Sequence, residues 1–253
     1  MKTISSSLLS SYTDVTAAFT TRQGGISRHP YTNANLAFHV GDNADDVKKN
    51  HLLLSKKLDY DTNKLVFMRQ IHSDKIVVVD ELMNFTTPPE CDALITDRIN
   101  IPLMVMSADC TPILIYDPLH KAIGAVHAGR AGALNEILPK TLYAMMREYG
   151  STFNDILILL GPSIHGCCYE VNEIIAHDVI TKGYENALRR ENERLFLDVN
   201  TILLQQLGSL GVQEESIEVI DTCTSCNNDT YFSYRADLQH TGRIAALIFL
   251  KPA

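Results

Sequence analysis

Apolar residues in this chain are concentrated in short runs that have the length of β-strands. The central runs Leu103–Met106, Ile113–Ile115 and Ala122–Val126 are apolar on both alternating sets of positions. A strand of this kind is covered on both faces, as in a layered fold. By the same pattern we expect further strands at Val15–Thr21, Val66–Met68, Ile76–Val79, Ala93–Thr96, Ile156–Leu160, Ile217–Ile220 and Arg243–Leu250.

Four segments show apolar residues at helical spacing instead. The first, Asn43–Leu58, begins with Asn43 and Asp46 at the spacing of a capping box. The second, Gly132–Tyr149, has a broad apolar face and is expected to kink at Pro139. The remaining two are Asn172–Thr181 and Val199–Gly208.

The order of these elements predicts a layered fold of the α+β class. Strands follow one another without intervening helices along much of the chain, which favours packed sheets with helices outside over a βαβ repeat. The chain contains no internal repeat and no long linker rich in Gly, Pro or Ser, so we expect a single domain over residues 1–253.

Composition excludes several classes of protein. The chain has 22 basic and 30 acidic residues and a net charge of −8, which argues against nucleic acid as a main partner. No apolar run approaches the roughly 18–20 residues of a membrane span, and the Ser-rich segment Met1–Ser11 does not resemble a signal peptide. Six irregularly spaced cysteines do not form the pattern of a secreted disulfide framework. We therefore expect a cytoplasmic protein that does not contact membranes.

The densest unusual segment is Ser107–Pro112, which contains Cys110 and is followed by a strand, a turn and a second strand with His127. A four-residue turn at Asp117–His120 would pair Tyr116 with Lys121. In that register Cys110 and His127 face each other, with Cβ atoms about 4.5–5.5 Å apart. The pairing depends on the register, because a slip of one residue reverses the face of one side chain.

A cysteine that faces a histidine has three interpretations. The two side chains can form a nucleophilic dyad, they can be two ligands of zinc or copper, or they can be a buried thiol and a hydrogen-bonded core histidine. His72, which follows the strand Val66–Met68, would supply a third ligand and leave a fourth position open, as in catalytic zinc sites. His39 is a further candidate, more typical of a structural or pocket-lining residue.

Several longer motifs in this chain resemble those of the bacterial YfiH-like family, also called the laccase-domain or multicopper polyphenol oxidase family. The resemblance extends from Phe19 to Leu250. The motifs are TTRQGGIS (Thr20–Ser27), NANLAFHVGD (Asn33–Asp42), RQIHSD (Arg69–Asp74), CDALITD (Cys91–Asp97), SADCTPILIYDP (Ser107–Pro118), VHAG (Val126–Gly129), LGPSIHGCCYEV (Leu160–Val171), DTCT (Asp221–Thr224) and YFSYRAD (Tyr231–Asp237).

This resemblance implies a four-layer α/β/β/α sandwich with mixed sheets, which is also the fold of the cytotoxic-necrotizing-factor-like cysteine hydrolases. It implies a metal held by His72, Cys110 and His127, with Cys110 and His127 also in catalytic roles. It further implies phosphorolysis of adenosine, inosine and methylthioadenosine, with inorganic phosphate as co-substrate, and an accompanying adenosine deaminase activity. Zinc with one open position suits deamination, and copper binds the same donor types. The expected partners are purine nucleosides, and the expected state is a monomer.

Phosphorolysis requires an anion site, and a guanidinium group matches phosphate oxygens. Asn35 and Asp42 are candidates for binding ribose hydroxyls or, equally, for stabilising a turn. Asp109 is next to Cys110 but on a strand would point away from it. The arginines placed in loops are Arg22, Arg69, Arg130 and Arg235, of which Arg22 and Arg235 lie inside family motifs.

The sequence departs from the family at one motif. The family usually reads HAGWRG where this chain reads HAGRAG, His127–Gly132, and the chain contains no Trp. Ala131 stands where an arginine is expected, and Arg130 carries a charge at the neighbouring position. This departure bears on phosphate binding and nucleoside stacking and leaves the three expected ligands unchanged.

Four other cysteines lie in two groups later in the chain. Cys167-Cys168 and Cys223-x-x-Cys226 include only one CxxC pair, so we expect them to belong to the scaffold around the pocket rather than to a second metal site.

The alternative functions are a copper-type polyphenol oxidoreductase, a metal-free Cys/His hydrolase such as a deamidase, and a non-catalytic metal-binding protein. Nine histidines without a His-x-His pair argue against the first of these.

Overall fold

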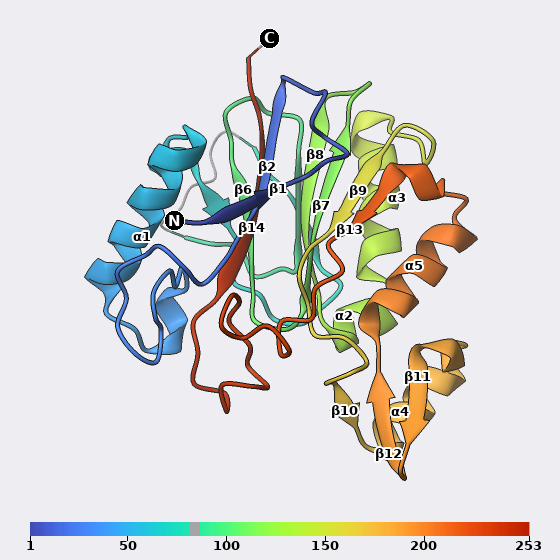
Figure 1. The fold of residues 1–253 in the computed structure, drawn as a ribbon. Coiled ribbons are helices and arrows are strands. Elements are labelled where there is room, and N and C mark those ends of the chain that lie inside the picture. The colour runs from blue at the N-terminus through green and yellow to red at the C-terminus, as the bar shows by residue number, and fades with distance from the viewer. Residues whose placement is uncertain (81–86, 253) are drawn as a thin grey trace.

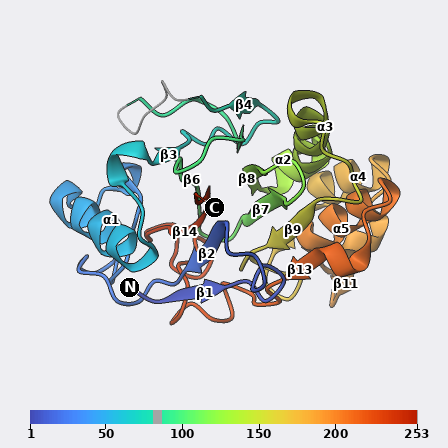
Figure 2. The same cartoon turned by 90° about the horizontal axis from the view of Figure 1, so that it is seen from above.

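The computed structural model describes residues 1–80 and 87–252. Two large mixed β-sheets pack face to face, and helices cover their outer faces (Figures 1 and 2). Along its strand order the first sheet consists of β1 (Thr3–Ser5), β2 (Val15–Thr20), β14 (Ile244–Leu250), β6 (Leu103–Ser107) and β3 (Val66–Phe67). The second sheet consists of β13 (Ile217–Val219), β9 (Leu157–Leu160), β7 (Thr111–Asp117), β8 (Ala122–Ala128), β5 (Ala93–Thr96) and β4 (Ile76–Val78).

The helices form the two outer layers. Helix α1 (Ala44–Leu58) lies on the first sheet, and helices α2 (Arg130–Leu134), α3 (Ile137–Tyr149) and α5 (Val199–Ser209) lie on the second (Figure 1). The predicted four-layer α/β/β/α sandwich is therefore confirmed. Short 3₁₀ helices occur at Phe38–Val40, Thr62–Lys64, Glu185–Ala187 and Glu214–Ser216.

The apolar pattern of the central strands explains why the layers pack. Strands β6, β7, β8 and β14 are buried along their whole lengths. One set of alternate residues, including Phe19, Val105 and Leu114, fills the space between the sheets. The other set packs against the helices, as Ile113 of β7 does on the second sheet. Burial of each such aliphatic side chain stabilises the fold by about 1.5–3 kcal/mol.

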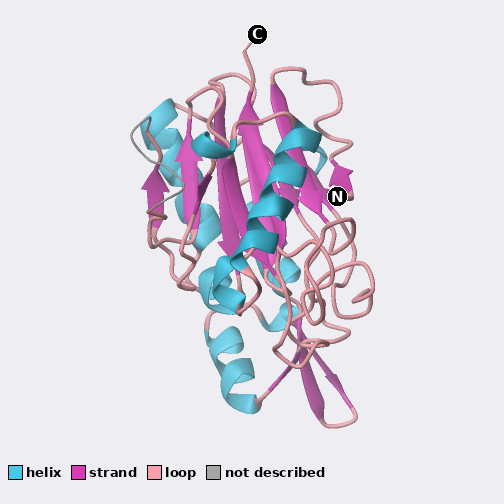
Figure 3. Ribbon diagram, turned by 90° about the vertical axis from the view of Figure 1, so that its left-hand side faces the viewer, coloured by secondary structure: helices cyan, strands magenta, loops and turns pink. Residues whose placement is uncertain are grey.

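A small third sheet extends beyond one end of the sandwich. It contains β10 (Glu170–Val171), β12 (Arg194–Leu197) and β11 (Leu188–Glu191), and it lies beside helix α4 (Glu173–Thr181) (Figures 1 and 3). These strands and β1 are not among the predicted elements. Strand β11 is largely exposed and rich in charge, so it lacks the apolar pattern on which the prediction relies.

The predicted helix Gly132–Tyr149 is divided in two. The chain leaves helical geometry at Asn135 and Glu136, and Glu136 adopts a left-handed conformation with φ of 60°. Pro139 lies in the first turn of α3, where its missing N–H has no intrahelical partner to lose. The expected kink at Pro139 is therefore wrong, because the break precedes it.

Among the described residues, no helix combines the length and the apolar character that a membrane span requires.

The buried histidine of α1 gives a prediction for stability. The Nε2–H of His51 donates to the carbonyl of Leu36 at 2.8 Å, and burial lowers the pKa of His51 to about 4. In the unfolded chain His51 has a pKa of about 6.5, so it takes up a proton at a higher pH than it does in the folded protein. The free energy of unfolding therefore decreases as the pH falls from about 6.5 towards 4. We expect this residue to account for about 3 kcal/mol of the loss between pH 7.5 and pH 4.

Urea unfolding at the two pH values would measure the loss for the native chain and for His51→Gln. Glutamine keeps an N–H donor and cannot titrate, so the variant should lose about 3 kcal/mol less than the native chain. Equal losses in the two proteins would contradict the assignment to His51.

Candidate functional site

His72, Cys110 and His127 come together at one end of the sandwich. Their potential ligand atoms all lie within 4.8 Å of one another. His127 lies near the end of β8, Cys110 immediately precedes β7, and His72 lies in the loop between β3 and β4. Left-handed backbone at His72, with φ of 57°, and at Asp109, with φ of 96°, turns the chain at the two positions where it enters the site. We call these three side chains the His/Cys/His cluster.

The register that brings Cys110 to His127 differs from the predicted one. Asp117 pairs with Ala122, and Pro112, not Cys110, pairs with His127. The predicted pairing of Tyr116 with Lys121 is therefore wrong. Each residue of β7 pairs with a residue of β8 that lies two positions further along the chain than predicted. A displacement by two preserves the face of every side chain, so Cys110 still lies on the same face as His127, as its diagonal neighbour.

The buried carboxylate of Asp92 organises the cluster. It accepts a hydrogen bond from Nδ1 of His127 at 2.9 Å and from the backbone N–H groups of Ile71 at 3.3 Å, His72 at 3.1 Å and Ser73 at 2.6 Å. The hydroxyl of Ser73 donates to it as well, at 2.8 Å. With Nδ1 engaged in this way, Nε2 of His127 is the nitrogen that remains available to a ligand.

The electrostatics of the cluster favour a bound cation. Burial lowers the pKa of His127, but the Cys110 sulfur and the Asp92 carboxylate outweigh it and raise this pKa to about 9. Burial and the neighbouring His127 lower the pKa of His72, which favours the neutral ring that a metal requires. Burial opposes ionisation of Asp92, yet its hydrogen bonds to His127 and Ser73 lower its pKa to about 2.

Gly129 packs so closely against the cluster that a larger residue would not fit. A Cβ atom at this position would lie 2.9 Å from Sγ of Cys110 and 3.2 Å from Nδ1 of His72. The backbone of Gly129, with φ of −78°, would accept any residue, so the glycine is needed for the space beside the two ligands. One thiolate and two imidazoles form a donor set typical of zinc and also of copper. The residues present therefore fit the metal that the resemblance implies.

Two cavities meet at Cys110. The larger has a volume of about 710 Å³ and is lined by all three cluster residues. The smaller has a volume of about 160 Å³ and is lined by Cys110 but not by the two histidines. Ala108 and Tyr234 also line both cavities. A ligand in either cavity would thus lie beside Cys110.

The arginines predicted to bind an anion have different surroundings. Arg130 lines the smaller cavity, and its guanidinium makes no hydrogen bond or ion pair within residues 1–80 and 87–252. Arg235 lines the same cavity, but its guanidinium donates to the carbonyl of Glu170 at 3.2 Å and lies over the ring of Tyr169. Arg69 lines the larger cavity and forms an ion pair with Glu90 at 2.8 Å. Arg130 is therefore the best placed of the three for an anion.

Three predicted substrate-binding residues line neither of these two cavities. Arg22 lies against Phe232 and forms an ion pair with Asp237, so its charge is used within the protein. Asn35 is fully buried, and its amide donates to Ala37 and to Asp42. The hydrogen bonds of Asn35 and Asp42 fit the structural alternative, and substrate binding by Arg22, Asn35 and Asp42 stays a prediction.

The structure places the two other candidates as follows. His39 lines the larger cavity, and burial lowers its pKa. Asp109 lines the smaller cavity, but its carboxylate accepts hydrogen bonds from Thr224 and from the backbone N–H of Arg235. Asp109 therefore holds the loop that carries Arg235 and is not a free proton carrier for the cluster.

Sequence reasoning missed Asp92 and Arg243. Asp92 is the one charged residue in the apolar run Cys91–Ile95, and a buried charge in such a run is a signal that could have identified it. Arg243 lines the larger cavity and lies over the ring of Tyr234. Its position just before the last strand carries no local sign of this role.

A methyl group at Gly129 tests the space beside the cluster. Gly129→Ala should weaken metal binding by about 10- to 100-fold, because overpacking costs roughly 1–3 kcal/mol. Gly208→Ala is the matched control, since a Cβ at Gly208 meets no atom within 4 Å. Zinc titration with a competing chelator would measure both variants, and equal affinities would show that the space is not used.

Removal of the Asp92 charge tests the support of His127. Asp92→Asn should lower metal affinity by about 10- to 100-fold, the usual effect of losing a carboxylate behind a histidine ligand. Asp155→Asn, in the partly exposed turn at residues 153–155, should leave it unchanged. The same chelator titration applies, and circular dichroism would verify that both variants are folded. Native affinity in Asp92→Asn would exclude a positioning role.

Comparison with known proteins agrees with this architecture. A family model described as multi-copper polyphenol oxidoreductase laccase matches residues 16–251. A protein of Corynebacterium glutamicum named purine nucleoside phosphorylase is 39% identical over 239 residues, which cover 93% of this chain and 94% of that relative. Purine nucleoside phosphorylase YlmD of Bacillus subtilis is 30% identical over 253 residues, which cover 95% of this chain and 90% of the relative.

Solved structures show the same fold. The hypothetical protein YfiH of Bacillus licheniformis matches with a TM-score of 0.90 and 33% identity, over 94% of this chain and 93% of that one. YlmD of Geobacillus stearothermophilus matches with a TM-score of 0.90 and 28% identity, over 95% and 93% of the two chains. With the extent of the family match and the fold in agreement, the chain belongs to the multi-copper polyphenol oxidoreductase laccase family.

Proposed function

We propose that this protein is a metal-dependent purine nucleoside phosphorylase that acts on adenosine, inosine and methylthioadenosine and also deaminates adenosine. The observation that carries the proposal is that the His/Cys/His cluster lines a cavity of nucleoside size, while its Cys110 also lines a second cavity that contains the guanidinium of Arg130, which has no partner among the described residues. The names of the relatives support the phosphorylase activity.

The larger cavity suits a nucleoside. Its volume of about 710 Å³ is within the usual range of roughly 300–1,000 Å³ for small-molecule sites. Phe38, Phe67 and Tyr234 line it and offer aromatic surfaces for a purine ring. Gln70 also lines it. Its side-chain amide donates to the carbonyl of Met106 and accepts from the N–H of Met106, so it forms part of the wall rather than binding a ligand.

The smaller cavity suits phosphate. Phosphorolysis breaks the bond between ribose C1′ and the purine nitrogen, forms a bond from C1′ to a phosphate oxygen, and leaves the purine with a proton. Arg130 can hold the phosphate by charge-assisted hydrogen bonds, worth about 1.5–3 kcal/mol each. Arg243 adds positive charge in the larger cavity, beside the cluster.

The metal fits between the two substrates. His72, Cys110 and His127 would hold zinc, and when bound it would supply Lewis-acid chemistry where the cavities meet. Asp92 keeps the ring of His127 in one orientation and one tautomer. Copper binds the same kinds of donor, and the choice between the two metals rests on measurement.

A second candidate function rests on the hydrogen bond between His127 and Asp92. Cys110, His127 and Asp92 are arranged as thiol, imidazole and carboxylate, the order found in metal-free cysteine hydrolases. In this case Cys110 would attack an acyl or amide carbon after His127 takes its proton. Such an enzyme would remain active when the metal is removed.

Incubation with adenosine, with and without phosphate, tests the proposal. The native protein should release adenine only with phosphate and inosine without it, as measured by separating adenine, inosine and hypoxanthine. Chelation, Cys110→Ala and His127→Ala should each abolish both products. No product from any nucleoside would contradict the proposal, and turnover of an amide substrate that resists chelation would favour the hydrolase.

Replacement of Arg130 separates phosphate binding from the rest of the chemistry. Arg130→Ala should raise the KM for phosphate by about 10- to 100-fold, because it removes charge-assisted hydrogen bonds, and should leave deamination nearly unchanged. Arg147→Ala is the control, since Arg147 is exposed on α3 and pairs with its neighbour Glu148. An unchanged KM in Arg130→Ala would place the phosphate elsewhere.

A further inference from the structure

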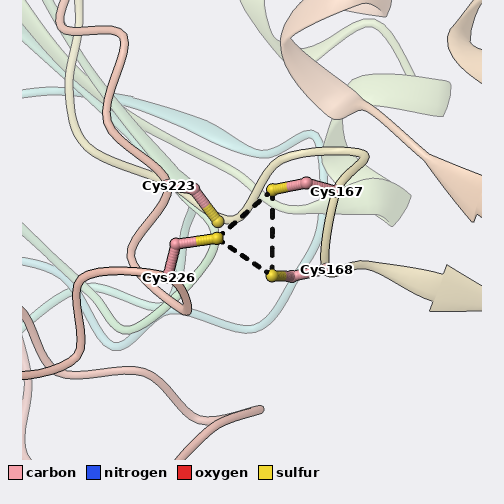
Figure 4. Close-up of side chains that lie close together, drawn as sticks. All are labelled: Cys167, Cys168, Cys223 and Cys226. Carbon is pink, nitrogen blue, oxygen red and sulfur yellow. Dashed lines mark hydrogen bonds between the residues drawn. The ribbon is translucent and has the colours of Figure 1, made fainter.

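Four cysteines that the His/Cys/His cluster does not use lie together at the surface. The sulfur atoms of Cys167, Cys168, Cys223 and Cys226 all lie within 4.8 Å of one another and point towards a common centre (Figure 4). They come from two loops that are far apart in the sequence, one after β9 and one after β13. We call them the four-cysteine cluster. The sequence pattern, which has only one CxxC pair, predicts scaffold at these residues rather than a second metal site.

We infer that the four-cysteine cluster is a structural metal site that binds one zinc ion through four thiolates. Zinc in such sites is tetrahedral, with Zn–S bonds of about 2.3 Å, so the sulfur atoms of a regular site lie about 3.8 Å apart. The distances here are 3.7 Å for Cys167 to Cys168, 3.5 Å for Cys167 to Cys226 and 3.3 Å for Cys168 to Cys226. A small outward movement of the side chains would create a tetrahedral shell.

The backbone around the cluster suits a metal site. Cys223 and Cys226 have the C-x-x-C spacing of a zinc knuckle, and backbone N–H groups of His165 and Cys226 are directed to the Cys223 sulfur. Cys167 and Cys168 lie in a turn closed by the hydrogen bond from Cys168 N–H to the carbonyl of His165, at 2.9 Å. This turn directs two adjacent side chains to the same side.

The loops are already joined beside the cluster. Ser163 and Cys223 form a bridge in which Thr224 N–H donates to the carbonyl of Ser163 at 2.9 Å. Arg235 donates to the carbonyls of Cys168 at 3.5 Å and Glu170 at 3.2 Å, which places a positive charge near four thiolates and a divalent ion. The net charge of such a site is −2, so a neighbouring guanidinium stabilises it.

The position of the cluster indicates what the metal would do. The loop after β9 contributes Ile164 and Tyr169 to the smaller cavity, and the loop after β13 contributes Tyr234 and Arg235. Zinc at the four-cysteine cluster would hold these two loops together and thereby fix the lining residues that both loops contribute to that cavity. The inference of a metal site is independent of the reaction proposed above, because it rests on the cysteines alone.

Metal content of purified full-length variants tests this inference. His72→Ala/His127→Ala, which lacks the His/Cys/His cluster, should retain about one zinc per chain by mass spectrometry of the metal. X-ray absorption of that zinc should show an all-sulfur shell at about 2.3 Å. Cobalt loaded into the same variant should give the intense visible bands of tetrahedral thiolate coordination. These measurements do not require any cysteine to be mutated, so they remain valid if cysteine variants fail to fold.

A second variant makes the assignment specific. Cys167→Ser/Cys226→Ser should contain one zinc fewer than the native protein and lose the all-sulfur signal, whereas Ser225→Ala, in the same turn, should keep both. The inference is overturned if His72→Ala/His127→Ala binds no metal, if its metal has nitrogen or oxygen ligands, or if the serine variant binds as much zinc as the native chain. A disulfide between Cys226 and Cys167 or Cys168 in the native protein as purified from a reducing compartment, in place of zinc, would also overturn it, in favour of a redox role.

Discussion

The buried carboxylate of Asp92 is the interaction on which the site depends. Two sheets packed face to face leave little polar surface between them, and a carboxylate in such a place is costly unless its oxygens are fully paired. Asp92 meets this condition by accepting hydrogen bonds from the loop at residues 71–73 and from the ring of His127. One side chain thus fixes the loop that carries one histidine and the ring of the other.

The same carboxylate explains why this position can serve either a metal or a thiol. A negative charge behind His127 favours a positive charge in front of it, and that charge can be a proton or a metal ion. The raised pKa of His127, about 9, expresses this preference for the proton. Cys110 then supplies a thiolate on the far side of the ring. The arrangement itself does not distinguish the two chemistries, which is why chelation separates the two candidate functions.

The strands and layers of this protein are predictable because burial on both faces leaves a local pattern. Strand β5 begins and ends where the pattern predicts, and β2, β8 and β14 differ by no more than two residues at an end. The predicted register between β7 and β8 is incorrect. The predicted turn at Asp117–His120 and the observed turn, which begins one residue later, contain similar residues, so the local sequence does not distinguish them. The face of Cys110 is nevertheless predicted correctly, since face depends on parity and parity survives a shift of two.

The parts that the sequence does not predict depend on contacts between distant segments. Strands β10, β11 and β12 have only two to four residues each, and β11 is largely exposed, so they are too short to show an apolar pattern of their own. The four-cysteine cluster joins a turn after β9 to one after β13, and neither pair of cysteines alone has the spacing of a four-ligand site. Arg243 enters the larger cavity because of how β14 pairs with β2 and β6, which is likewise a long-range property.

The HAGRAG departure from the family motif acquires a meaning from the geometry. Position 130 begins helix α2 and faces the smaller cavity, so this chain places a guanidinium where the family usually has an indole. The next position, Ala131, lies on a different side of the same short helix, since successive helical residues point about 100° apart. Arg130 therefore does not reproduce the arginine expected at position 131, and it adds a positive charge to a cavity that Tyr169, Tyr234 and Arg235 also line. Under the proposed function, the added positive charge beside Cys110 would favour phosphate at this position, and stacking of the purine would depend on the aromatic side chains of the larger cavity.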